Sequence, residues 1–577
     1  MRRSLYAALP LGWAVVVLVL TLTPAAEMPV TPVWELLSFD TAAHAGVFAV
    51  LAGLSWLALR QSRRWPRLRP YLGRIVLGGS ILFGGLIEIL QMIMRLGRHG
   101  EWSDLLSDAL GAAVAVGVVT AWAARRSPRA AVCWLGLLGA VAAGGAGPGP
   151  LRAQELPRVR RIIAQLAAPG LHGRGYVRHG EHRAAAYLCG RLRQLGLEPL
   201  APDYIQPFTL DVNTFPDKLA LAFDFGAVRS SGSDLRRVMR PGRDFIAAPE
   251  SSGGLGRSSA ARRLMVLDTL IFSDSLVQRR LLYQTLGGGL LLRARDAQRL
   301  ATLPAALQQH LDSAAVIITL VPKLTASLAA EQGRPVRLLL TEDAWQRACA
   351  GQPARPRVTF QLTAVLRRDY LTQNLAAIVR GTVRPDSFLV VSAHYDHLGM
   401  MGRRVYFPGA NDNASGVALL LELAAHYARP ENRPACSVVF LLFGAEEAGL
   451  LGSRYFVARP LIPLRQIKFL INLDLLGTGE LGATVVNGRL LPGPFQRLVA
   501  LNDAHHYLPA LAPRGRAANS DHFPFSEAGI PTFFLYTRGG SAAYHDVADQ
   551  PGALSLAGFA GAFGLVRDFL NELGAAR

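Results

Sequence analysis

Six ionisable residues in the C-terminal half of the chain have the types and spacing of a hydrolytic metal site. Four lie within residues 390–453, in VVSAHYDHLGM, PGANDNASG and FLLFGAEEAGLLGS, and two stand further on, in INLDLLG and AAYHDVADQ. Imidazole and carboxylate groups in such a mixture are the ligands that catalytic zinc sites use. In chain order they are His394, Asp412, Glu446, Glu447, Asp474 and His545.

Each of these residues also has an ordinary structural explanation when it is taken alone. Asp412 in NDNASG fits a helix cap or an Asx turn, and adjacent glutamates usually lie on a solvated face. Glu446 and Glu447, however, directly follow the apolar run 438–445. Because burying unpaired carboxylates is costly, a bound cation is their natural partner. The joint occurrence of the six residues therefore favours a metal site.

The elements around these residues predict how they are brought together. From residue 373 onward, apolar runs of strand length such as 387–393 and 436–444 alternate with helical patterns such as 416–429. Near-continuous apolar strands that alternate with helices predict a mostly parallel sheet with helices on both faces. Sites in such sheets gather beyond the carboxyl ends of the strands. His394, Glu446, Glu447 and Asp474 stand at or just after such ends.

The motifs as a set identify a family. HYDH, GANDNASG, GAEEAGLLGS, NLDLLG, SDHFPF and YHDVADQ together resemble the M28 family of zinc aminopeptidases. The resemblance covers residues 155–204 and 366–577. It implies an α/β fold of the zinc-exopeptidase type, two Zn²⁺ ions as cofactors and peptides as substrates.

Carried over residue by residue, the resemblance gives each ligand a place. One zinc ion would be held by His394 and Asp474. The second would be held by Glu447 and His545, and Asp412 would bridge the two ions. No ligand position is substituted, which argues against a relative that has lost its activity.

The same resemblance implies roles for residues that do not bind metal. Glu446 would act as the general base that takes a proton from water and passes it to the leaving amine. Asp396 would orient the first histidine ligand. Tyr544 would stabilise the tetrahedral oxyanion. Asp521 and His522 match the SDH motif of the family and would support the site without ligating metal.

Residues 205–365 interrupt this pattern. They contain strand-like runs separated by segments rich in Gly and Ser, such as PESSGGLGRSS, and no chemical motif. The pattern predicts a β-rich insert that is similar to protease-associated modules. The insert departs from the minimal pattern of the family, so the resemblance leaves the substrate specificity open.

The first part of the chain predicts a helical membrane domain. Arginines are concentrated in the loop between the apolar runs 42–59 and 75–94 and in the loop between the runs 110–123 and 130–146. Residues 27–40, by contrast, contain no Lys or Arg. By the positive-inside rule the N-terminus is cytoplasmic, and residue 150 onward lies outside a bacterial-type cell membrane. We divide this part into a multi-span domain, 1–126, and a segment with linker, 127–154, whose apolar run is either an anchor or signal-like. The apolar runs are 9–23, 42–59, 75–94, 110–123 and 130–146.

Polar residues within this part of the chain give a second resemblance, to the VanZ-like membrane family, over about residues 8–124. The sequence departs from that family at Asp108, where Asn is common, and at Thr41, where Lys often follows the first Asp. The polar groups would form either an interhelical hydrogen-bond network or a site for a small ligand or a lipid headgroup. The features that carry the resemblance are Asp40, His44, IEILQ, Arg98 and SDLLSDALGA.

The charge of the chain does not indicate a nucleic-acid partner. The formal net charge is +20, yet it comes mostly from dispersed arginine, without basic clusters or interleaved aromatic residues. The expected partners are peptide substrates and the lipid bilayer, and the sequence leaves the oligomeric state open.

We therefore predict a membrane-anchored, zinc-dependent exopeptidase, most simply an aminopeptidase, whose catalytic domain is extracytoplasmic. Two alternatives stay open. A glutaminyl-cyclase-like acyltransferase would share the fold and much of the ligand set. A receptor or scaffold that kept the peptidase fold only for binding predicts a broken ligand set, whereas this one is intact.

Overall fold

The structure is a computed structural model. It describes residues 156–227, 234–256, 262–286, 288–351 and 356–575, residues 71–94, and the shorter stretches 10, 12–14, 17, 48–56, 58–59, 112–113 and 115–117. Contacts divide the chain into two units, Met1–Gly149 and Pro150–Arg577.

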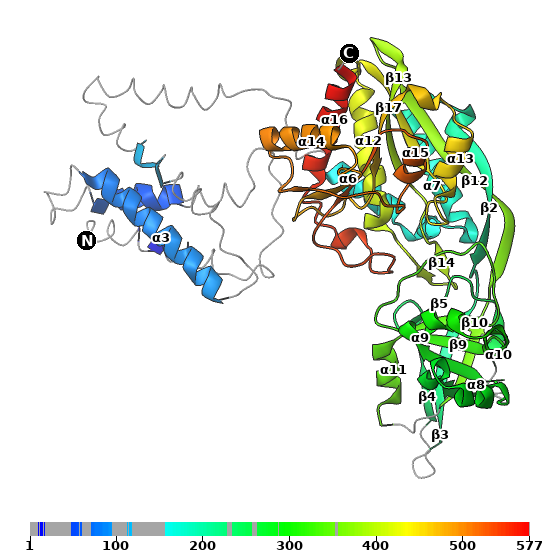
Figure 1. Ribbon diagram of the computed structural model, residues 1–577. Helices are drawn as coiled ribbons and strands as arrows, with labels where there is room; N and C mark the ends of the chain where they lie inside the picture. Colours follow the sequence, from blue (N-terminus) through cyan, green and yellow to red (C-terminus); the bar gives the residue numbers. More distant parts are fainter. Residues whose placement is uncertain are drawn as a thin grey trace, which may run out of the picture. The chain divides into compact units, whose positions relative to one another are not determined.

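The described residues of the first unit include helix α3, Leu72–Met94, which is drawn in blue in Figure 1. Leu72 and Val76 of this helix pack with Ala52 and Trp56 in a buried apolar cluster. Within the described stretches, we find no helix with the length and hydropathy that a membrane crossing requires. The predicted run 130–146 lies outside the described residues, as do most of 9–23 and the polar residues Asp40, His44, Arg98, Asp104 and Asp108.

The second unit contains a nine-stranded sheet with the order β1-β12-β16-β13-β17-β20-β18-β19, in which β2 also pairs with β12. The predicted mixed α/β fold is thus observed. Strands β16, β13, β17 and β20 at the centre are parallel, whereas β12 and β18 run antiparallel to their central neighbours. The parallel arrangement that we predicted for most of the sheet is therefore concentrated at its centre. The bounds are β1 Glu198–Pro199, β2 Ile205–Thr214, β12 Val365–Val379, β13 Arg384–His394, β16 Cys436–Phe443, β17 Ile467–Leu473, β18 Ala483–Val486, β19 Leu511–Pro513 and β20 Thr532–Thr537.

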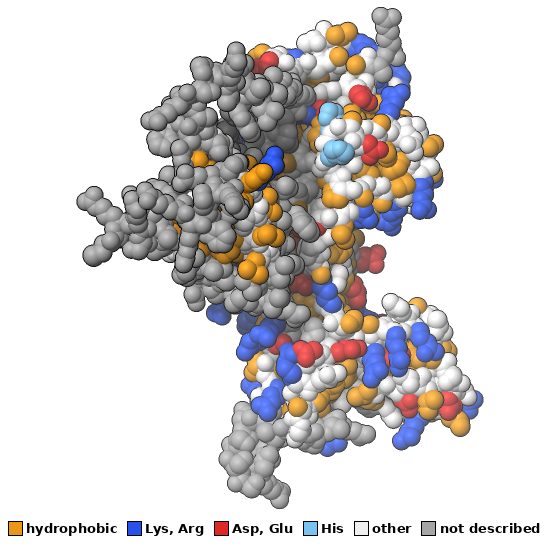
Figure 2. Space-filling view, turned by 90° about the vertical axis from the view of Figure 1, so that its left-hand side faces the viewer, with side chains coloured by type: hydrophobic (Ala, Val, Ile, Leu, Met, Phe, Trp, Pro, Cys, Tyr) orange, Lys and Arg blue, Asp and Glu red, His pale blue; other side chains and the backbone are white. Residues whose placement is uncertain are grey.

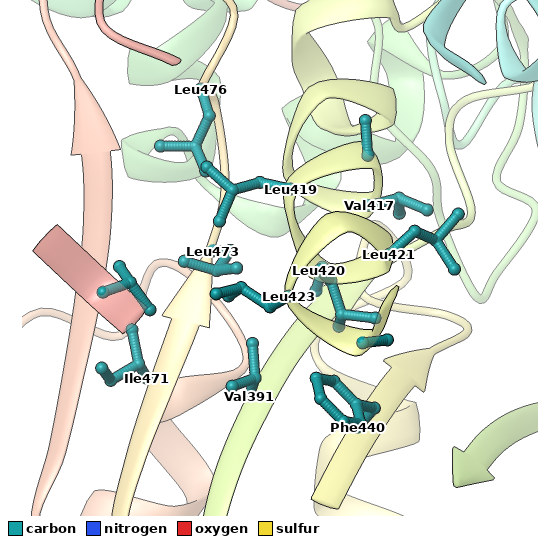
Figure 3. Close-up of a cluster of buried hydrophobic side chains, with 14 of the residues drawn as sticks. Val391, Val417, Leu419, Leu420, Leu421, Leu423, Phe440, Ile471, Leu473 and Leu476 are labelled. Atoms are coloured by element: carbon teal, nitrogen blue, oxygen red, sulfur yellow. The ribbon is translucent and has the colours of Figure 1, made fainter. Parts of the chain in front are cut away.

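Helices cover both faces of this sheet, which explains why its central strands are almost wholly apolar. In β13, Leu389 and Val391 point into one apolar cluster, while Phe388 and Val390 point into another on the opposite face. Figure 3 shows leucines of α12 packed over Val391 and neighbouring strand residues. The larger cluster is covered by α6 Leu156–Leu166, α7 Gly180–Gln194, α12 Gly416–Tyr427, α14 Pro492–His505 and α16 Phe559–Ala575, and the smaller by α13 Leu451–Ala458 and α15 His522–Glu527.

A second nine-stranded sheet, green in Figure 1, is formed wholly within residues 219–362. Strands β7 to β10 are parallel, and short helices that we did not predict lie between several of its strands. Strand β2, which we had placed in the insert, pairs instead with β12 of the first sheet. The bounds are β3 Leu219–Ala227, β4 Asp234–Val238, β5 Phe245–Ala247, β6 Gly254–Gly256, β7 Arg262–Val266, β8 Gly289–Arg293, β9 Val316–Val321, β10 Val336–Thr341, β11 Arg357–Leu362, α8 Ser275–Leu282, α9 Ala294–Arg299, α10 Ala305–Leu311 and α11 Glu342–Cys349.

The insert shares its apolar core with the segment that follows His394. Leu398, Met401 and Phe407 of that segment belong to the same buried cluster as Phe245 of the insert. The segment also forms a small hairpin of β14, Met400–Met401, and β15, Val405–Tyr406. On the face drawn in Figure 2, basic side chains over the insert are interspersed with acidic ones.

Candidate metal centre

Three neighbouring parallel strands deliver four of the candidate residues to one edge of the first sheet. His394 is the last residue of β13, Asp474 directly follows β17, and Glu446 and Glu447 come three and four residues after Phe443, the end of β16. Parallel strands that are adjacent in a sheet end at the same edge. The apolar residues of these strands fix the register because they pack into the two clusters, one on each face of the sheet. The polar residues that follow the strands are therefore held side by side.

Asp412 lies between two pairs, each of which combines a histidine with a carboxylate. Its Oδ1 is 3.4 Å from Nε2 of His394, and its Oδ2 is 3.2 Å from Nε2 of His545. Beyond Asp412, His394 Nε2 lies 3.4 Å from Asp474 Oδ1, and His545 Nε2 lies 3.1 Å from Glu447 Oε2. The two halves of the predicted site are thus brought together around the predicted bridge.

His397 also enters the site, although we gave it no role. Its Nδ1 lies 2.7 Å from Glu447 Oε1, and its buried Nε2 has no hydrogen-bond partner. Donor atoms of His397, Asp412 and Glu447 converge within 4.8 Å of one another, and so do those of His394, Asp412 and Asp474. The visible signal was the second histidine of HYDH, three residues after the first.

The buried carboxylates and imidazoles shift one another's pKa values strongly. Burial raises the pKa of Glu446 well above its ordinary value, and the nearby Glu447 carboxylate raises it further, against the opposing effect of His394. Burial by itself would lower the pKa of His545, but Asp412 and Glu447 raise it to about 11. The buried carboxylates therefore favour positive charge between them.

These observations fit a metal centre. Two groups of converging N and O donors share one carboxylate, and Asp474 Oδ1 is buried without a hydrogen-bond partner. Histidine with carboxylate is a donor set that suits zinc. His394 and Asp474 would hold one ion, Glu447 and His545 the other, with Asp412 between them.

Two segments of the chain match models of known protein families. Residues 374–569 match the family model described as peptidase family M28, and residues 10–123 match the model described as VanZ/LLP1. The chain contains a peptidase family M28 domain and a VanZ-like domain. Both predicted resemblances are thereby confirmed.

Curated relatives agree with this assignment, and a solved structure supports the fold. A probable zinc metalloprotease of Pyricularia oryzae is 39% identical over 113 residues, which cover 19% of this chain and 22% of that protein. An aminopeptidase of Bacillus subtilis is 31% identical over 188 residues, covering 30% of this chain and 38% of the relative. The chain therefore spans well under half of these curated relatives. A zinc aminopeptidase structure from Bacillus subtilis, 20% identical, matches with a TM-score of 0.51 over 73% of this chain and 95% of that one, which supports the fold.

Within the M28 domain, Asp396 fixes the backbone of the glutamate pair. Its Oδ1 accepts a hydrogen bond from the Glu446 amide at 3.1 Å, and its Oδ2 accepts one from Tyr176 Oη at 3.4 Å. Its backbone carbonyl oxygen lies 3.3 Å from Nδ1 of His394, the ligand that we expected it to orient. Burial raises the pKa of Asp396 to about 7, with His394 opposing the shift.

Arg174, a buried arginine of the second unit, holds the loop that carries Asp412, and sequence reasoning missed it. The guanidinium of Arg174 is fully buried and donates only to backbone carbonyl groups. From the other side, the carboxylate of Asp549 accepts the amides of Asn411 and Asp412, at 2.9 and 3.0 Å. The carbonyl partners of Arg174 are those of Leu166, Tyr395, Pro408, Gly409 and Asp412.

The remaining predicted residues line the site without joining the ligand groups. The ring of Tyr544 stacks on His545 with the centroids 3.8 Å apart, and it borders a pocket of about 350 Å³ together with Asp412. Both carboxylate oxygens of Asp521 are buried without a hydrogen-bond partner, and so are both ring nitrogens of His522. Burial raises the pKa of Asp521 to about 7, and His394 opposes this rise.

Proposed function

We propose that the chain is a zinc-dependent exopeptidase, specifically an aminopeptidase that removes N-terminal residues from peptides. The observation that carries this proposal is the placement of Asp412 between two pairs, His394–Asp474 and His545–Glu447. A centre of this kind suits the hydrolysis of a peptide bond, because water is a poor nucleophile and the amide carbonyl a poor electrophile. Two bound zinc ions would polarise the carbonyl and lower the pKa of a water.

The protein's own groups supply the proton transfers. Glu446 is adjacent to the ligand Glu447, and Asp396 holds its amide in place. We assign Glu446 as the general base that accepts a proton from water and delivers it to the departing amine. Tyr544, which lines the pocket next to Asp412, would donate a hydrogen bond to the developing oxyanion.

We further propose that the VanZ-like unit anchors the enzyme in a cell membrane, with the M28 domain outside the cytoplasm. The support is the five apolar runs and the arginine-rich loops between them. Protease added to intact spheroplasts should digest the M28 domain, whereas a tag at Met1 should survive until the membrane is broken. Protection of the M28 domain in intact spheroplasts would overturn this topology.

The catalytic proposal is tested with the full chain in detergent. Aminoacyl-arylamides, the same compounds with blocked amino groups, and peptides with N-terminal glutamine are incubated before and after chelation. We expect release from free N-termini only, loss of activity on chelation, and recovery with zinc. Glu446→Gln should retain zinc and lose about 10²–10⁴-fold in kcat. Glu431→Gln, at an exposed position of the same domain, should behave like the parent.

The other possible functions give different results in the same assay. Cyclisation of N-terminal glutamine without hydrolysis of any arylamide would identify a glutaminyl-cyclase-like enzyme. Peptide binding without turnover, in a chain that takes up no zinc, would identify a binding scaffold. Either result would overturn the aminopeptidase proposal.

A further inference from the structure

A segment of the insert contacts the loop that carries His545. This segment, residues 322–328, follows strand β9, and the loop spans residues 541–547. The amide of Ala326 donates to the carbonyl oxygen of His545 at 3.1 Å. Nδ1 of His545 lies 3.0 Å from the carbonyl oxygen of Ala326. A single insert residue therefore holds both the backbone and the ring of a predicted ligand.

A lysine of the same insert segment secures the rest of the loop. Nζ of Lys323 donates to the carbonyl oxygens of Ala542 and Tyr544. It also lies 3.9 Å from a carboxylate oxygen of Asp546. Val547 packs against the apolar core of the insert. The loop is thus attached to the insert on both sides of His545.

The backbone of His545 needs such support. Its φ angle of 54° lies in the left-handed region, which residues with a Cβ atom adopt only when their surroundings hold them there. The ring also has to present one particular nitrogen. With Nδ1 donating to the Ala326 carbonyl, Nε2 is left free to face Asp412 and Glu447, at 3.2 and 3.1 Å.

The other histidine of the centre is supported differently. Nδ1 of His394 finds its partner, the carbonyl oxygen of Asp396, two residues further along its own segment. His394 is also the last residue of a central strand, β13. One half of the centre is therefore built within the M28 sheet, whereas the other half depends on the insert.

We propose that the insert is a structural part of the metal centre, in which Ala326 and Lys323 position His545 to bind one of the two ions. The proposal rests on the proposed two-zinc function. A shift of residues 322–328 would therefore weaken the binding of one zinc ion and leave the ion at His394 and Asp474 in place. Ala326 and Lys323 are positioning residues, since they act through His545.

The test uses the full chain and three lysine variants. Lys323→Met removes the donor to the loop, and Lys323→Arg keeps a cationic donor. Lys218→Met is the matched control, because Lys218 is an exposed lysine of the same insert. Zinc affinity is measured by chelator competition, and amide hydrogen exchange of residues 541–549 is measured in the zinc-free chain.

We expect Lys323→Met to lower the affinity for one zinc ion by about 10-fold and to leave the affinity for the other unchanged. A loss of this size lies at the lower end of the range for groups that orient a ligand. Exchange in 541–549 should accelerate, activity should return at high zinc, and Lys323→Arg should recover part of the affinity. Affinity and exchange equal to those of Lys218→Met would overturn the proposal, as would equal weakening of both ions. A parent chain without zinc would overturn both proposals, whereas bound zinc without hydrolysis would overturn only the proposed function.

Discussion

The two sheets of the second unit both contain four consecutive parallel strands, but the residues at the ends of those strands differ. In the insert, the polar residues there serve local structure. Asp268, two residues after β7, accepts the amide of Leu270 at 3.0 Å, and Thr341, the end of β10, accepts the amide of Ala344 at 3.2 Å. In the M28 domain, the corresponding residues, such as Asp474, are buried and converge on one another.

This difference shows what marks a site in an α/β sheet. The insert has a pocket of about 560 Å³ at its strand ends, lined by Leu267, Leu292 and Trp345 among others. Yet both groups of converging metal donors found in the described residues belong to the M28 domain. Position beyond the carboxyl ends of strands is therefore insufficient by itself. Among the described residues, histidines and buried carboxylates whose donor atoms converge are what distinguish the first sheet.

The largest effect should come from removing the shared carboxylate. Asp412→Asn keeps the size of the side chain but removes the charge between the two histidines. We expect loss of at least one zinc ion and a fall in activity to background, because both halves of the centre lose a ligand. Metal analysis and arylamide hydrolysis measure this. Asp386→Asn, at an exposed position of the same domain, is the control; two retained zinc ions in Asp412→Asn would argue against the bridge.

The second prediction concerns Arg174, which donates hydrogen bonds to the backbone of the loop that carries Asp412. Arg174→Met should destabilise the second unit, because five backbone carbonyls lose a buried donor. An unsatisfied buried acceptor costs about 1–3 kcal/mol, so we expect a loss of more than about 3 kcal/mol. Urea unfolding of the full chain measures it, with the exposed Arg183→Met as control. Equal stability of the two variants would mean that water replaces the guanidinium.

Arg174 also shows where sequence reasoning stops. The strand-end residues were predictable, because apolar runs fix the strands and the residues after them must share an edge. The partners of Arg174 come from three separate segments of the chain, Leu166, Tyr395 and the loop 408–412, and no local sequence pattern encodes their proximity. The short helices of the insert were missed for a related reason: helices such as α9, Ala294–Arg299, are too short to show a clear period.

The third prediction separates support from ligation within the M28 sheet. Asp396→Asn retains the size of the side chain and weakens its hold on the Glu446 and Glu447 amides. We expect a loss of about 10–100-fold in zinc affinity or kcat, as is typical of residues that orient ligands. Chelator competition measures the loss in zinc affinity, and steady-state kinetics at saturating zinc measure the loss in kcat. A zinc affinity and a kcat equal to those of Asp386→Asn would contradict the positioning role of Asp396.

The smallest effect should come from Thr341, a residue at the end of a parallel strand in the insert. Thr341→Ala removes the hydroxyl that caps α11, and loss of such a cap costs about 1 kcal/mol. Urea unfolding should show this loss, and Thr341→Ser, which keeps the hydroxyl, should restore most of it. Zinc content and kcat should not change, since Thr341 serves only its own helix. A lowered kcat in Thr341→Ala at saturating zinc would show that the strand ends of the insert also take part in catalysis, and the contrast between the two sheets would then fail.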